Sequence, residues 1–154
     1  MEQLITRVLI GVLATAIMDI WGVVRHPLLG LPRADYRLIG RWFAYMPRGR
    51  FRHAPITASA PLPAEFLIGW TTHYAIGITF ALLLVAVWGA RWLEHPTVGP
   101  ALLVGVVTVI APLFLMQPAM GAPRTPRTVL QSLITHTIYG LGLYAAAWII
   151  TFIP

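Results

Sequence analysis

Four long apolar runs dominate this sequence of 154 residues, of which only 10% are charged, against about 25% in soluble domains. The runs cover residues 4–24, 66–88, 98–116 and 129–153. Because a helix rises 1.5 Å per residue, each run of about 20 residues can cross the ~30 Å hydrocarbon layer. The sequence therefore predicts an all-α polytopic membrane protein, a four-transmembrane-helix bundle in one domain over residues 1–154.

The distribution of arginine predicts how the chain is oriented in the membrane. All 11 basic residues are arginine, against 5 acidic residues, so the formal net charge is +6. Only Arg7 and Arg91 fall on the side of the termini; the others lie in the loop 25–65 or in the short loop after the third run. By the positive-inside rule the loop 25–65 is cytoplasmic and both termini are periplasmic. In so apolar a chain this charge predicts anionic lipid head groups of the bilayer as partners, and not nucleic acid.

Residues 33–47 of the cytoplasmic loop have the pattern of an amphipathic helix. Arg33, Arg37 and Arg41 recur at helical spacing, and apolar side chains fall largely on another side of the same helix. This pattern predicts a helix in the membrane interface whose three arginines face lipid. The segment 48–63 is rich in glycine, proline and small polar residues, which predicts an irregular return to the second span.

Three ionisable residues lie within the apolar runs, where such groups are costly and usually face the protein interior. Asp19, His73 and His136 each lie about 8 to 10 Å inside the arginine-rich end of a span, from the helical rise. Each also belongs to a stripe of small residues, which favours close helix packing. We therefore predict one buried polar cluster that opens toward the cytoplasm.

Six further polar residues are expected to support this cluster: Thr15, Thr72, Thr108, Gln117, Thr135 and Glu65. In the third span, Pro112 removes the bond to the carbonyl of Thr108, which predicts either a simple kink or a carbonyl oxygen freed toward the cluster. His26, His53 and His95 fall in loops and are expected to be exposed. An alternative for His53 is that it folds back beside Glu65.

The residues leave the chemistry of the cluster open. Asp19, His73 and His136 could simply hold the helices together by hydrogen bonds, or could bind a divalent metal through two imidazoles and one carboxylate. A third alternative is haem b between the two histidines, beside glycines that leave room for the ring. A fourth is a proton-coupled or substrate-binding site in a small transporter. Sequence motifs of soluble enzymes are absent, so whether the protein is an enzyme stays open.

Several short motifs resemble one family of membrane proteins. They include Gly40-Arg41-Trp42, Gly69-Trp70-x-x-His73-Tyr74-x-x-Gly77, Gln117-Pro118-x-x-Gly121, and His136 followed by Gly140-Leu141-Gly142-Leu143-Tyr144. This combination resembles an uncharacterised bacterial family of small integral membrane proteins, domain of unknown function 2938, over nearly the whole chain. The resemblance implies a bacterial inner-membrane location and four spans, and it implies no activity.

Together these observations predict a multi-pass inner-membrane protein with a binding or structural role centred on the buried polar cluster. The competing interpretation is a metal- or haem-binding membrane enzyme or redox subunit. A homo-oligomer or a larger membrane complex is compatible with either interpretation.

Overall fold

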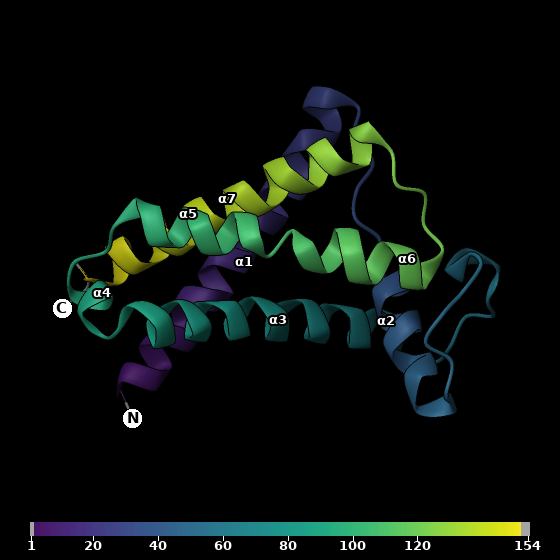
Figure 1. Cartoon of the computed structure of the whole chain (residues 1–154), viewed down its shortest axis with the longest axis horizontal. Coiled ribbons are helices and arrows are strands. Elements are labelled where there is room, and N and C mark those ends of the chain that lie inside the picture. The colour runs from purple at the N-terminus through teal and green to yellow at the C-terminus, as the bar shows by residue number, and fades with distance from the viewer. Residues whose placement is uncertain (1, 152–154) are drawn as a thin grey trace.

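The structure is a computed structural model that describes residues 2–151, and in this range it is helical with no strands (Figure 1). The prediction of four spans is confirmed, since four helical segments are long and apolar enough to cross a membrane. The third span is formed by three consecutive helical pieces. The spans are α1 (Glu2–Leu29), α3 (Glu65–Trp88), α5 (Val98–Val107) continued by η3 (Ala111–Met116) and α6 (Gln117–Met120), and α7 (Pro126–Thr151).

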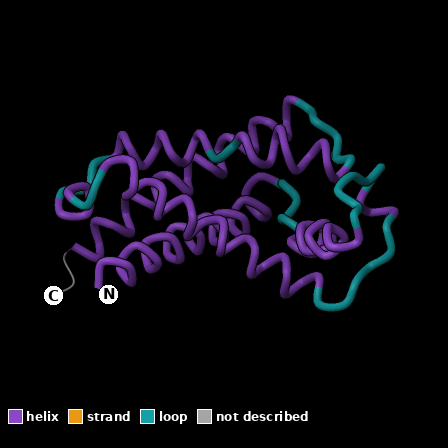
Figure 2. The backbone as a smooth tube through the Cα atoms, turned by 60° about the horizontal axis from the view of Figure 1, so that its bottom comes forward, coloured by secondary structure: helices purple, strands orange, loops and turns teal. Residues whose placement is uncertain are grey.

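The two ends of the described chain lie at the same end of the bundle, as four crossings require (Figure 2). The short helix α4 (Arg91–Glu94) lies there too, where the Thr151 hydroxyl donates to the Leu93 carbonyl over 3.2 Å. The opposite end carries the arginine-rich segment with α2 (Tyr36–Tyr45), η1 (Met46–Arg48) and η2 (Ile56–Ala58).

Several helix ends lie beyond the predicted bounds; the third span, for example, continues past residue 116 to Met120. The first helix continues past Val24 to Leu29, with Pro27 inside its last turn, and is followed by Gly30, whose φ is +62°. The last helix starts at Pro126, three residues before the predicted start at 129; residues 152 and 153 of the predicted span lie outside the described part of the chain.

The third span is broken near its middle. It leaves α-helical geometry after Val107 and resumes as the π-helix η3, which contains Pro112. The Thr108 carbonyl accepts from the Ala111 amide at 3.2 Å, so the kink is present but the oxygen is not freed toward the cluster, because the chain tightens locally there.

The transmembrane core lies between α1, α3 and α7, with α5 packed on α7. Small residues allow these close approaches: a Cβ on Gly11 would lie 2.6 Å from the Ile78 Cα, and one on Gly105 would lie 2.5 Å from the Gly140 Cα. Buried apolar side chains such as Ile10 and Leu84 fill the remaining space. Large apolar side chains cover the outer faces, as expected for surfaces in contact with lipid.

The amphipathic helix of the cytoplasmic loop is α2, and it crosses α3 where two glycines meet. A Cβ on Gly40 would overlap the Glu65 carbonyl oxygen, and one on Gly69 would overlap the Tyr36 carbonyl oxygen. The apolar side of α2 packs on protein, because Trp42 is buried in a second cluster with Ile56 and Met120. This packing fixes the start of α2 beside α1 and α3.

Candidate functional site

Asp19 on α1, His73 on α3 and Tyr36 at the start of α2 meet in one hydrogen-bonded group. The Tyr36 hydroxyl donates to Asp19 Oδ1 over 2.6 Å, and His73 Nε2 lies 3.0 Å from the same oxygen. The Tyr36 hydroxyl also lies 3.1 Å from His73 Nε2, and the two rings stack with centroids 4.4 Å apart. One carboxylate oxygen therefore accepts from both neighbours.

The donors in this group follow from its geometry. A carboxylate only accepts, so His73 Nε2 carries the proton that it shares with Asp19. Burial and the bond to Asp19 raise the pKa of Tyr36 above its usual value, so its hydroxyl stays a donor. When the His73 ring is neutral, its Nδ1 is an acceptor; this nitrogen makes no hydrogen bond to the described residues.

His136 on α7 is held by Thr108 and does not join Asp19. The Thr108 hydroxyl donates to the Gly105 carbonyl over 2.6 Å and lies 2.7 Å from His136 Nδ1. Since that hydroxyl has one proton, it must accept from His136 Nδ1–H. Nε2 of His136 is therefore the acceptor of the neutral ring, without a protein partner in residues 2–151.

Both histidines line one cavity of about 200 Å³, which we call the inner cavity. Its other walls are mainly apolar, with Met18, Ile76 and Phe80 among them. A smaller cavity of about 50 Å³ is also lined by both histidines and includes Thr15. The sequence predicted the three ionisable groups to point at one another; the structure instead pairs Asp19 with His73 and places His136 across a cavity.

A second cavity of about 230 Å³, the polar cavity, adjoins the inner one. Polar side chains line it, and all but two of them come from α7. They are Arg25, Gln117, Thr128, Gln131, Ser132, Thr135 and His136. Arg25, Thr135 and His136 also line the inner cavity, so the two cavities share a wall.

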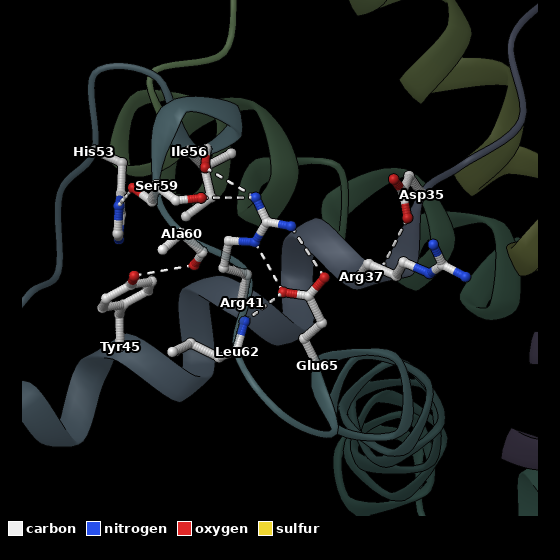
Figure 3. A network of polar contacts seen from close by, with 10 residues as sticks. All are labelled: Asp35, Arg37, Arg41, Tyr45, His53, Ile56, Ser59, Ala60, Leu62 and Glu65. Atoms are coloured by element: carbon white, nitrogen blue, oxygen red, sulfur yellow. Dashed lines mark hydrogen bonds and ion pairs between the residues drawn. The ribbon is translucent and has the colours of Figure 1, made fainter.

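Arg41 does not face lipid, contrary to the prediction, because it forms a bidentate ion pair with Glu65 (Figure 3). Its Nε lies 2.8 Å from Glu65 Oε2, and its Nη2 lies 3.0 Å from Oε1. Nη1 donates to the carbonyls of Ser59 and Ile56 over 3.0 and 3.5 Å. The bonds to Glu65 raise the pKa of Arg41 further. We call this group, which fastens the loop to α2 and α3, the arginine anchor.

His53 is buried beside the arginine anchor, although the sequence predicted exposure (Figure 3). Its Nδ1 lies 2.7 Å from the Ser59 hydroxyl, and its ring packs edge-on against Tyr45. Nε2 is sealed from solvent without a partner. Burial and the nearby charge of Arg50 lower the pKa of His53, so the ring is neutral near pH 7.

The remaining residues predicted from the sequence differ in how deeply they are buried and in whether they reach a cavity. Thr15 is buried, and its hydroxyl donates to the Gly11 carbonyl over 2.7 Å. Thr135 accepts from Arg25 over 3.3 Å. Gln117 lines the polar cavity, whereas Thr72 is only partly buried on α3. His26 and His95 are exposed, as predicted, and so are Arg33 and Arg37.

A metal centre formed by Asp19, His73 and His136 is not assembled in the structure. Within residues 2–151, no three histidine, aspartate or glutamate side chains come together in a way that could hold a metal ion. Nδ1 of His136 is bonded to Thr108, and Oδ1 of Asp19 already accepts from Tyr36 and His73.

Sequence reasoning missed Tyr36 and Arg25. Tyr36 lies outside the spans, so an argument from membrane depth could not include it. Its only sequence signal is its place directly after the helix cap Asp35, whose carboxylate accepts from the Arg37 amide. From the sequence Arg25 is only a topogenic charge, because the predicted span ends at Val24.

Comparison with known proteins places the chain in a family. No curated protein and no solved structure matches it. The model of a family described as protein of unknown function (DUF2938) matches residues 8–150, so the chain belongs to that family.

Proposed function

We propose that this protein binds a small, mostly apolar organic molecule in the inner cavity, with His73 and His136 as hydrogen-bond acceptors toward it. One observation carries the proposal: each imidazole is fixed by a bond at one nitrogen, while its other nitrogen has no protein partner. Neither of those second nitrogens is sealed from solvent, in contrast to Nε2 of His53.

Hydrogen bonding between helices alone accounts less well for this geometry. Buried polar groups that serve only to join helices normally satisfy one another directly. Here His136 bonds to Thr108, at the end of α5, and His73 bonds to Asp19 on α1. Both rings line the inner cavity. A ring oriented from behind by a carboxylate or hydroxyl is typical of a histidine that meets a ligand.

The walls of the inner cavity indicate the chemistry of the ligand. Apolar side chains such as Ile39, Phe80 and Met116 favour an apolar body. Two acceptor nitrogens in that setting favour a hydroxyl or other donor on the body, because an unpaired acceptor facing an apolar ligand loses hydration without compensation.

A matched pair of probes tests this proposal. We expect 4-ethylphenol to raise the unfolding temperature of the purified protein in detergent more than ethylbenzene, which lacks the hydroxyl. The preference should disappear in His136→Phe and persist in His95→Phe, a control at an exposed histidine. Equal responses to both probes in the unmodified protein would contradict a donor-binding site.

We also propose that the protein lies in a bacterial inner membrane with both termini in the periplasm. The arginine-rich end of the bundle supports this orientation, since all exposed arginines of the described residues except Arg91 belong to it. An alkaline phosphatase fused to the C-terminus should be active, and green fluorescent protein at the same position should be dark. The reverse pattern would invert the orientation.

Anionic lipid remains the proposed partner of this end, now through Arg33 and Arg37 and without Arg41. Arg33 and Arg37 are exposed, whereas Arg41 is buried in an ion pair with Glu65. The double variant Arg33→Gln, Arg37→Gln should bind fewer anionic lipids than the unmodified protein, as counted by native mass spectrometry. Undiminished binding would remove these residues from the lipid surface.

A further inference from the structure

The polar cavity is built on one face of α7. The five residues follow one another at steps of three, one, three and one, so they share one side of the helix. They are Thr128, Gln131, Ser132, Thr135 and His136. They occupy the first turns of a membrane-spanning helix, where polar side chains are unusual unless they face a cavity or another helix. This face therefore needs a polar occupant.

Arg25 supplies the charge of this cavity and has no acidic partner. Its Nη1 donates to the Thr135 hydroxyl over 3.3 Å, and its Nη2 donates to the Pro32 carbonyl over 3.1 Å. Among the described residues no carboxylate lies within 4.0 Å of this guanidinium. A half-buried guanidinium held only by neutral oxygens favours an anion, because charge-assisted bonds to an anion are about twice as strong as neutral ones.

The shared wall connects this cation to the inner cavity. Arg25, Thr135 and His136 line both spaces, so one molecule can place a charged group in the polar cavity and its apolar body in the inner cavity. The polar cavity is about 230 Å³ and the inner one about 200 Å³, which suits a small amphipathic molecule and no polymer.

We propose that the ligand is a small amphipathic organic acid whose carboxylate is held by Arg25 in the polar cavity. The side-chain amide of Gln131 and the hydroxyl of Ser132 complete the hydrogen bonding around this head group, whereas the Thr128 hydroxyl already donates to the Thr125 carbonyl over 2.9 Å. The proposal rests on the proposed function, because the inner cavity must hold the body of the same molecule.

The test compares two molecules that differ by one carboxylate, 4-ethylphenol and 3-(4-hydroxyphenyl)propanoate. Their dissociation constants would be measured by calorimetry at pH 7 in detergent for the full chain. In the unmodified protein the acid should bind about tenfold more tightly than the phenol, the gain expected for one charge-assisted pair. The ratio of the two constants within each variant removes any general effect of a substitution on stability.

Arg25→Gln should lower this ratio to about twofold or less while 4-ethylphenol still binds, and Arg25→Lys should keep part of it. Arg127→Gln is the matched control, since it removes the same charge from an exposed position on α7. A ratio near one in the unmodified protein, or the same loss in Arg127→Gln, would overturn the carboxylate site. Binding of the acid alone, dependent on Arg25, would support this site and overturn the proposed function; failure of both probes would overturn both.

Discussion

Two polar centres lie at the same end of the bundle and differ in how fully they are satisfied. In the arginine anchor every nitrogen of Arg41 has an acceptor, and Glu65 Oε2 also accepts from the Leu62 amide over 3.1 Å. In the site around the inner cavity, His73 and His136 each use one ring nitrogen only.

This difference in hydrogen bonding indicates a structural role for the arginine anchor and a binding role for the two histidines at the inner cavity. A saturated, buried ion pair has nothing left to offer a ligand, and its loss is felt by the fold. A half-satisfied imidazole that lines a cavity and is not sealed from solvent keeps one ring nitrogen available to a ligand, so its loss affects binding more than folding. We therefore expect substitutions in the two centres to fail in different ways.

The largest effect is expected in the arginine anchor. Glu65→Ala would leave Arg41 buried and unpaired, which should lower the free energy of unfolding by about 3 to 5 kcal/mol. Unfolding in mixed detergent micelles would measure it. Glu94→Ala removes an acid from an exposed position and should have little effect. Equal losses in the two variants would show that the ion pair does not hold the fold.

The next effect concerns the contact that places Tyr36 beside Asp19. Gly40→Ala would drive a methyl group into the Glu65 carbonyl, so α2 must separate from α3 at a cost of about 3 kcal/mol. Gly22→Ala is the control, because a Cβ there meets nothing within 4 Å. A folded Gly40→Ala protein with unchanged stability would contradict the close crossing.

Within the cavity site, a double-mutant cycle should resolve which side chains touch. Asp19→Asn and Tyr36→Phe should couple by about 1 kcal/mol, because they share a hydrogen bond of 2.6 Å. Asp19→Asn and His136→Phe should instead be additive, since no bond joins these residues. Strong coupling in the second cycle would mean that His136 reaches the Asp19 group after all.

The smallest effect is a pH dependence in the loop around His53. Its pKa is lowered in the folded protein from a usual value near 6.5, so the unfolded loop takes up a proton at higher pH than the folded one. Stability of this loop should therefore be lost as pH falls below about 6.5. Hydrogen-exchange protection of residues 49–61 should drop between pH 7.5 and 5.5, and His53→Gln should remove the pH dependence.

An unchanged protection at pH 5.5 would show that the loop accommodates the charged ring. Such a result would also weaken the contrast with the cavity site, because it would mean that the sealed Nε2 of His53 can find a partner.

The four helices that are long and apolar enough to cross a membrane could be predicted because length and hydropathy are read directly from the sequence. Membrane depth and the stripes of small residues also selected Asp19 and His73. In the structure His73 Nε2 lies 3.0 Å from Asp19 Oδ1. The same reasoning could not locate His136 relative to them, because the direction of a side chain depends on its hydrogen-bond partner, here Thr108.

The contacts of the arginine-rich segment could not be predicted from the sequence. Arginine spacing put Arg41 on the same stripe as Arg33 and Arg37, yet its partner Glu65 lies 24 residues further along the chain. Helical periodicity is a local signal and cannot reveal such a pair. For the same reason Arg25 and Tyr36, which reach the cavities from outside the predicted spans, were found only in the structure.

The proposed binding site requires that His73 and His136 each present an unprotonated ring nitrogen to the inner cavity. Nitrogen-15 spectra of histidine-labelled protein in nanodiscs at pH 7.5 would test it most directly, with single histidine variants for assignment. We expect His73 to carry its proton on Nε2 and His136 on Nδ1. 4-Ethylphenol, whose hydroxyl has one proton to donate, should shift Nε2 of His136 while His26 and His95 stay unchanged. The opposite tautomers, or shifts confined to exposed histidines, would contradict the account.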